Sequence, residues 1–160
     1  MPTELLSGLW IGDVNDIYNR EFYIDNNINI VINCTRDQGF LDLPHLKKVR
    51  IPLSNVLDMN NDIYTLNMKQ KEITEFIYNS IELNNIFVYC HNGITVSPLI
   101  VALFMIRYGE ISLDTIRDIL RSKNRNICLD YDLSIFLGYY LNDLHLLLKY
   151  LIVFGSLSHL

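Results

Sequence analysis

The chain has 160 residues, half of them hydrophobic, and a formal net charge of −5. These values predict one globular domain with a sizeable core. The negative charge argues against nucleic-acid binding, which needs a basic surface. The three cysteines, Cys34, Cys90 and Cys128, are widely spaced and form no CxxC pair. This pattern favours reduced thiols in the cytoplasm over a disulfide framework or a metal site, and no cofactor is expected.

Short apolar runs bounded by turn residues predict four strands, at residues 5–12, 28–34, 47–53 and 85–90. Apolar residues at three- and four-residue steps predict four helices, over 62–83, 97–109, 112–124 and 130–151. Ser97 and Ser112 are the expected N-caps of two of these helices, and Asp62 of another. Strands that alternate with helices predict a single α/β domain, with a central, mostly parallel twisted sheet and helices on both faces.

The C-terminal segment HLLLKYLIVFGSLSHL, residues 145–160, is unusually apolar. Lys149 interrupts it, and it is shorter than the ~20 residues that a membrane-spanning helix needs, so no span is expected. The pattern leaves two interpretations open. The segment either continues to pack on the core, or it forms a surface for a second copy or another protein.

The segment YCHNGITVSP, residues 89–98, joins a predicted strand to a predicted helix. A tight loop in this position binds anions, because unpaired N–H groups and the helix dipole point into it. Gly93 allows the tight turn, and Cys90 is a candidate nucleophile. Cys90 is also explained as a small buried residue, which is the usual state of a free cysteine, and Cys34 and Cys128 are expected to be core residues for the same reason. The loop, residues 90–96, contains no lysine or arginine to pair with a phosphate.

The segment VYCHNGITVSP resembles the loop of the cysteine-dependent protein phosphatases, whose motif is HCxxGxxR followed by Ser or Thr. Other segments resemble the dual-specificity members of that superfamily in the same order: LLSGLWIGD, INIVINCT, RIPLSN, SPLIVALFMIRYGEISLDTIRDILRSKN and DLSIFLGYYL. The resemblance covers about residues 5–150. It implies a dual-specificity phosphatase-like domain over residues 1–150, with residues 151–160 as an apolar tail that continues the last helix.

The resemblance places Cys90 at the nucleophile position, and Gly93 and Ser97 match the motif. Tyr89 stands where the family has histidine, and Val96 stands where it has arginine. The remaining loop positions are His91, Asn92, Ile94 and Thr95.

The family's general acid is an aspartate that follows the Ile-Pro-Leu segment. In RIPLSN this position holds Asn55, which has no comparable proton to donate. Asp58 is a candidate compensating acid, although a solvated loop charge explains it equally well. His91 could supply a weak cation at the rim of the loop. These departures predict a less reactive thiol at Cys90 and a severe loss of turnover.

The leading hypothesis is therefore a pseudophosphatase that binds a protein partner, which could be a phosphoprotein or, through the apolar C-terminal region, a second copy. The alternative is a weak cysteine-dependent phosphatase that acts on substrates with good leaving groups. A third hypothesis is sulfur transfer at a rhodanese-like loop, which the long phosphatase resemblance disfavours. Abundant Asn and Ile with a single alanine suggest an AT-rich genome, and a poxvirus-type origin would place the protein in the host cytoplasm.

Overall fold

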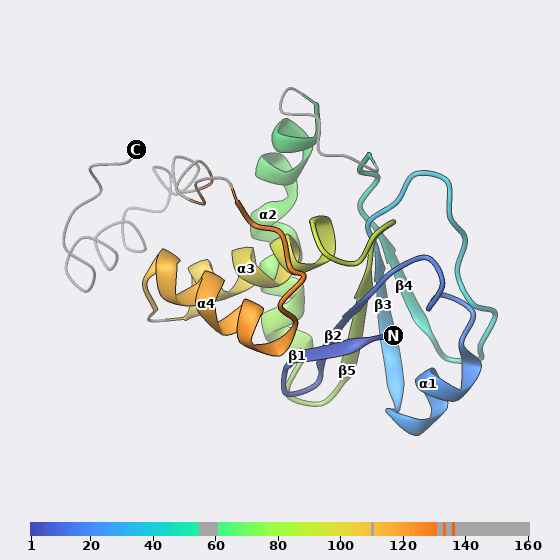
Figure 1. Cartoon of the computed structure of the whole chain (residues 1–160). Coiled ribbons are helices and arrows are strands. Elements are labelled where there is room, and N and C mark those ends of the chain that lie inside the picture. The colour runs from blue at the N-terminus through green and yellow to red at the C-terminus, as the bar shows by residue number, and fades with distance from the viewer. Residues whose placement is uncertain (55–60, 110, 131–132, 134–135, 137–160) are drawn as a thin grey trace.

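The computed structural model describes residues 1–54, 61–109, 111–130, 133 and 136. Within this part of the chain, five strands form one sheet in the order β1–β2–β5–β3–β4 (Figure 1). Every neighbouring pair is parallel except β1 with β2. The strands are β1 (Thr3–Leu6), β2 (Leu9–Gly12), β3 (Ile28–Asn33), β4 (Lys47–Arg50) and β5 (Asn85–Tyr89).

Helices lie on both faces of this sheet, and the predicted fold class is confirmed. The larger core lies between one face and the helices α2 (Asn61–Ser80), α3 (Val96–Tyr108) and α4 (Leu113–Lys123). The short helix α1 (Arg20–Asp25) packs on the opposite face. Ten residues of α3 are buried, which explains why its sequence is apolar nearly all round.

The central strand β5 sends alternate side chains to the two faces, as the pleat of a strand requires. Ile86, Val88 and Cys90 belong to the larger core beneath the long helices. Phe87 and Tyr89 belong to the smaller core, where aromatic rings from β5 and α1 pack edge to face. Cys90 and Tyr89 therefore point to opposite sides of the sheet.

The predicted strand over residues 5–12 is wrong, because that segment contains a turn. The chain reverses at Gly8, whose φ of +78° favours glycine, and β1 pairs with β2 in an antiparallel hairpin. Helix α1 was not expected, since its six residues are too few to show a clear helical period. Asn19 caps it by accepting a hydrogen bond from the Phe22 N–H at 3.2 Å.

The long helices α2, α3 and α4 are found where they were predicted, with different starts for two of them. Thr95, not Ser97, is the N-cap residue of α3, so Ser97 lies within the first turn. Asp62 likewise lies inside the first turn of α2 and does not cap it from outside. Ser112 caps α4 as expected, accepting from the Thr115 N–H at 3.3 Å.

Most of the helix expected over residues 130–151, and the tail 151–160, lie outside the described residues. Leu133 and Phe136 are described, and both are fully buried in the larger core. Among the described residues, no helix is long and apolar enough to cross a bilayer.

Candidate active site

The loop of residues 90–96 joins the carboxyl end of β5 to the start of α3. Strand β5 lies between β2 and β3, so the loop sits at the carboxyl edge of the parallel strands, where α/β sheets place their ligands. Gly93 has a φ of +70°, a left-handed conformation that glycine adopts without strain. A β-carbon at this residue would lie 3.1 Å from the carbonyl carbon of Gly12, so the loop also needs glycine for space.

The sulfur of Cys90 lies within the loop and is buried, with the residue only 2% exposed. The backbone N–H groups of Gly93 and Ser97 donate to Sγ at 3.3 and 3.2 Å. The Ser97 hydroxyl oxygen lies 3.3 Å from the same sulfur. Sequence analysis placed these three residues in one site, and the structure brings them together. Ser97 acts from inside the first turn of α3.

The side chain of Asn92 turns inward over the same loop. Its carbonyl oxygen Oδ1 accepts from the Ile94 N–H at 3.0 Å, the Thr95 N–H at 3.2 Å and the Thr95 hydroxyl at 3.0 Å. The same oxygen lies 3.7 Å from the Cys90 sulfur. Sequence analysis included Asn92 as a loop position and did not foresee these contacts.

Val96 is the loop residue that the resemblance aligns with the motif's arginine. It is the first residue of α3, only 1% exposed, and it packs in the larger core with Leu99 and Ile100. An isopropyl group in this place adds apolar packing and offers an anion neither charge nor a hydrogen bond.

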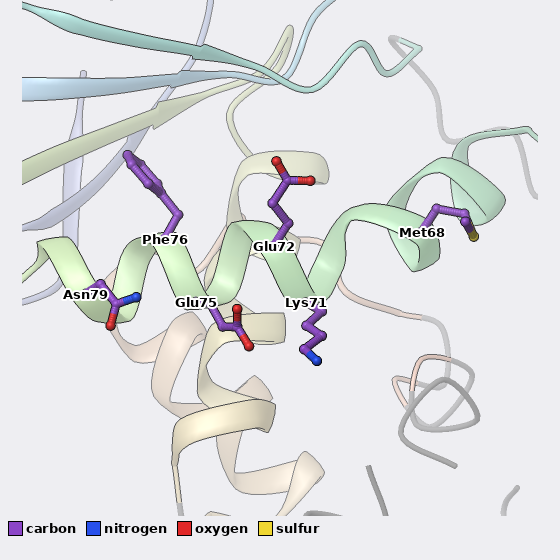
Figure 2. Close-up of a pocket in the computed structure, with 6 residues that line it drawn as sticks. All are labelled: Met68, Lys71, Glu72, Glu75, Phe76 and Asn79. Carbon is purple, nitrogen blue, oxygen red and sulfur yellow. The ribbon is translucent and has the colours of Figure 1, made fainter. Parts of the chain in front are cut away.

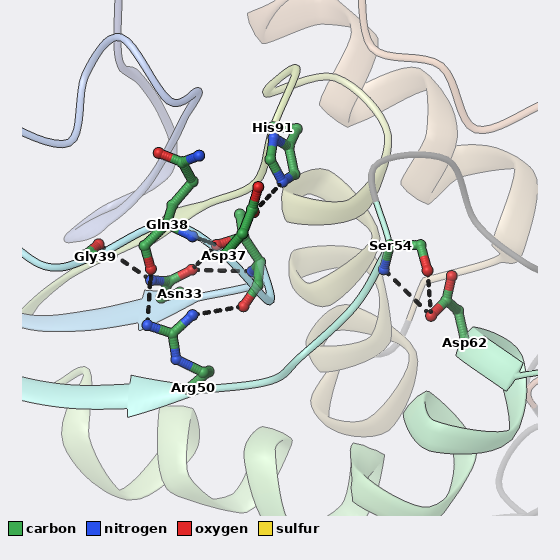
Figure 3. A network of polar contacts seen from close by, with 9 residues as sticks. Asn33, Asp37, Gln38, Gly39, Arg50, Ser54, Asp62 and His91 are labelled. Carbon is green, nitrogen blue, oxygen red and sulfur yellow. Dashed lines mark hydrogen bonds and ion pairs between the residues drawn. The ribbon is translucent and has the colours of Figure 1, made fainter.

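His91 lies at the rim of the loop, with its side chain 16% exposed. Its Nε2 is 2.8 Å from Oδ1 of Asp37, a residue in the segment that follows β3 (Figure 3). A positive charge on His91 would therefore pair with the Asp37 carboxylate and be less available to a bound anion. Asp37 was not among the residues that sequence analysis singled out.

A polar network fixes the segment that carries Asp37 (Figure 3). The Asn33 side-chain amide donates to the carbonyls of Gln38 and Gly39 at 2.9 and 3.2 Å. The Arg50 guanidinium donates to the carbonyls of Thr35 and Gln38, each at 2.7 Å. These bonds tie the ends of β3 and β4 to the rim of the loop.

Tyr89, which the resemblance aligns with the motif's histidine, belongs to this network and points to the face of the sheet opposite the Cys90 sulfur. Its hydroxyl donates to the Gly39 carbonyl at 2.6 Å on the opposite face of the sheet. Burial raises the pKa of the Tyr89 phenol well above its usual range. Tyr89 therefore positions the segment that holds Asp37 and carries no charge at neutral pH.

Asn55 and Asp58, the expected acid position and its candidate replacement, lie outside the described residues. The residue just before them is anchored by Asp62, which is fully buried. Oδ1 of Asp62 accepts from the N–H and hydroxyl of Ser54 at 3.2 and 3.3 Å (Figure 3). It also lies 3.4 Å from the guanidinium of Arg36, which follows β3. Asp62 thus fixes where the segment of residues 55–60 begins.

The two other cysteines differ in their surroundings. Cys34, at the end of β3, is buried as expected, and its N–H donates to the Tyr89 carbonyl at 2.9 Å. Burial, and secondly the neighbouring Cys90, raise the pKa of the Cys34 thiol. Cys128 was expected in the core, which is wrong, because it is partly exposed. Its thiol donates to Asp130 at 3.0 Å, and this hydrogen bond raises its pKa.

Among the described residues, no group of three or more His, Cys, Asp or Glu side chains could hold a metal ion. The described site is a loop of backbone N–H donors around a buried thiol, with Asp37 and His91 at its rim. This arrangement, a cysteine loop between a parallel strand and a helix, is the one that the resemblance to the cysteine-dependent phosphatases implies.

Comparison with known proteins gives the same class. The family model for the dual specificity phosphatase catalytic domain matches residues 9–138, so the chain belongs to this family. No curated protein matches the chain.

Among solved structures, human DUSP28 is 16% identical with a TM-score of 0.75, covering 90% of this chain and 95% of that one. A mouse putative dual specificity phosphatase, complexed with zinc tungstate, is 18% identical with a TM-score of 0.70, covering 94% and 89%. The human tyrosine phosphatase-like serine/threonine/tyrosine-interacting protein is 13% identical with a TM-score of 0.68, covering 92% and 97%. At these identities the likeness shows the fold.

Proposed function

We propose that this chain is a catalytically impaired dual-specificity phosphatase-like protein, a pseudophosphatase, that acts by binding a protein partner in phospho-signalling. The observation that carries the proposal is Val96, which is buried against apolar neighbours at the position where the family's arginine grips phosphate. An arginine fork makes two hydrogen bonds to phosphate oxygens and neutralises charge in the transition state. Losing one preorganised donor of this kind costs about 10²–10³ in rate.

The general acid supports the same conclusion. Asn55 stands at the family's aspartate position and cannot protonate a leaving alkoxide or phenolate. General acid catalysis is worth about 10²–10⁴, so the two losses together predict a fall of roughly 10⁴ or more. Rescue by Asp58 would require its carboxylate to reach the loop, and the preceding described residue, Ser54, is held by Asp62.

Protein binding is the proposed role because the chain offers apolar surface outside the loop. Exposed Tyr64, Met68 and Tyr78 lie along α2. A shallow hollow on this helix is lined by Met68, Lys71, Glu72, Glu75, Phe76 and Asn79 (Figure 2). There Phe76 and Glu72 point towards the sheet, and Lys71 and Glu75 point away from it.

The apolar residues 151–160, beyond the proposed domain of residues 1–150, are a second candidate surface, for a homodimer. The reduced loop charge makes tight capture of a phosphoprotein the less favoured form of binding. The proposed location is the cytoplasm, or the host cytoplasm for a viral protein, because all three cysteines are free thiols.

One observation favours a second candidate function, a weak phosphatase that acts on substrates with good leaving groups. Cys90 keeps two backbone N–H donors and a hydroxyl around its sulfur, the arrangement of a loop that holds a nucleophilic cysteine. An aryl phosphate with an acidic leaving group needs no general acid. Asparagine at position 55 would therefore lower the rate of hydrolysis of such a substrate only slightly.

Hydrolysis of an aryl phosphate decides between the two functions. The wild-type chain is compared with the double variant Val96→Arg plus Asn55→Asp, and with Val96→Leu plus Asn55→Asp as a control that lacks the guanidinium. Circular dichroism first establishes that each variant is folded. The pseudophosphatase proposal expects turnover only in the arginine-containing variant, abolished there by Cys90→Ser. Wild-type turnover that Cys90→Ser removes would overturn it in favour of the weak phosphatase.

A further inference from the structure

We propose that the side chain of Asn92 is an internal ligand of the loop, occupying the place where an anion would bind. This inference rests on the proposed function, because it concerns which group fills the anion-binding loop when the family's arginine is absent. It adds a regulatory property, namely that any anion must first displace this side chain.

The contacts of Asn92 place its oxygen inside the cradle. Oδ1 accepts from two consecutive backbone N–H groups, those of Ile94 and Thr95, at 3.0 and 3.2 Å. N–H groups at a loop that opens a helix are the donors that an anion uses. The same oxygen is 3.7 Å from the Cys90 sulfur. One oxygen therefore takes two backbone donors of the loop and lies beside the thiol, in space that a bound anion would need.

The chemistry of the loop explains why an asparagine fills this place. With valine at position 96, the loop itself supplies no guanidinium to recruit an anion, so its N–H groups need another acceptor. Oδ1 of Asn92 accepts from two of them, and one such hydrogen bond is worth about 0.5–1.5 kcal/mol net. Asparagine reaches N–H groups two and three residues ahead of itself, which are those of Ile94 and Thr95. The Thr95 hydroxyl adds a third donor at 3.0 Å.

A purely local role for Asn92, as a brace for the loop backbone, makes a different prediction. If Asn92 only braced the loop, any weakening of its hydrogen bonds would disorder the cradle and lower its affinity for anions. If Asn92 competes with anions, removing its carboxamide would raise that affinity. Asn92→Ala and the nearly isosteric Asn92→Asp separate the two roles.

The experiment is a titration with sodium tungstate, followed by the backbone amide resonances of Ile94 and Thr95 in ¹⁵N-labelled protein of 18.7 kDa. Asn92→Ala should lower the dissociation constant on the order of tenfold, equal to about 1.4 kcal/mol, since one net hydrogen bond is worth about this much. Asn92→Asp keeps an acceptor in place but adds a negative charge, so it should raise the constant by about tenfold or more.

Opposite shifts in the two variants support the internal ligand. Unchanged or weaker binding in folded Asn92→Ala, or binding in Asn92→Asp as tight as in wild type, overturns it. If Asn92→Ala does not fold, Thr95→Val takes its place, because it removes one donor to Oδ1 and should tighten tungstate binding about two- to threefold. Weaker or equal binding in Thr95→Val then overturns the proposal. Binding is read without turnover, so this inference and the pseudophosphatase proposal can fail separately.

Discussion

Replacing Gly93 by alanine tests the geometry of the loop most directly. Its φ of +70° is left-handed, which costs an L-residue with a β-carbon about 1–2 kcal/mol. The added β-carbon would also lie 3.1 Å from the Gly12 carbonyl carbon and 3.2 Å from the Asp13 nitrogen. That backbone cannot easily move, because Gly12 pairs with Tyr89 in the sheet. Strain and crowding together predict a loss of about 2–3 kcal/mol in the free energy of unfolding.

Urea denaturation measures this loss, with Gly39→Ala as the matched control. A β-carbon at Gly39 would meet only the hydroxyl oxygen of Tyr18, at 3.1 Å, the far end of a flexible side chain. The control should therefore lie within about 0.5 kcal/mol of wild type. A Gly93→Ala variant as stable as Gly39→Ala would refute the left-handed, crowded geometry assigned to the loop.

Two further predictions concern residues that hold the surroundings of the loop. Asp62→Ala leaves the Ser54 N–H without its acceptor and should lower the free energy of unfolding, measured in urea, by about 1–3 kcal/mol. Asp62→Asn keeps one acceptor oxygen and should lower it less. Equal losses in the two variants would contradict the anchoring role of Asp62. Tyr89→Phe removes the bond to Gly39 and should cost about 0.5–1.5 kcal/mol at pH 7. Burial raises the pKa of the Tyr89 phenol, so its contribution to the free energy of unfolding is complete below about pH 10. At higher pH the phenol ionises first in the unfolded chain, and this contribution is lost. The free energy of unfolding, measured from pH 8 to 11, should therefore fall less steeply with pH in Tyr89→Phe than in wild type, and an equal slope would contradict a buried phenol.

The alternation of strands and helices could be predicted because the spacing of apolar residues differs between the two kinds of element. The run NIFVYC identified the buried β5, and the apolar SPLIVALFMIRY identified the buried α3. The hairpin at Gly8 was missed because LLSGLWIG is apolar on both sides of a turn that only the backbone reveals. The sheet order could not be derived from period, since an apolar run does not specify which strand lies beside it.

The same limit explains what was missed in the site. The loop residues follow one another in the chain, so a contiguous motif is enough to predict that they form one loop. Asp37 reaches His91 only because β3 lies next to β5 and their carboxyl ends meet at one edge. The inward turn of Asn92 depends on the direction of two N–H groups, which no spacing of residue types encodes. The one available signal for Asp37 was a charged residue three positions after the predicted strand of residues 28–34, at the carboxyl edge of the sheet.

The retained Cys90 has a structural reason to be present that does not require turnover. Its sulfur accepts from the N–H groups of Gly93 and Ser97 in a buried place, where an unpaired donor costs about 1–3 kcal/mol. Cys90, Gly93 and Ser97 thus have a role in holding the loop, whereas Val96 and Asn55 stand where the resemblance expects the arginine and the acid. A loop can keep its cysteine, glycine and serine for folding while its catalytic positions change. The presence of the cysteine alone is therefore weak evidence for phosphatase activity in this chain.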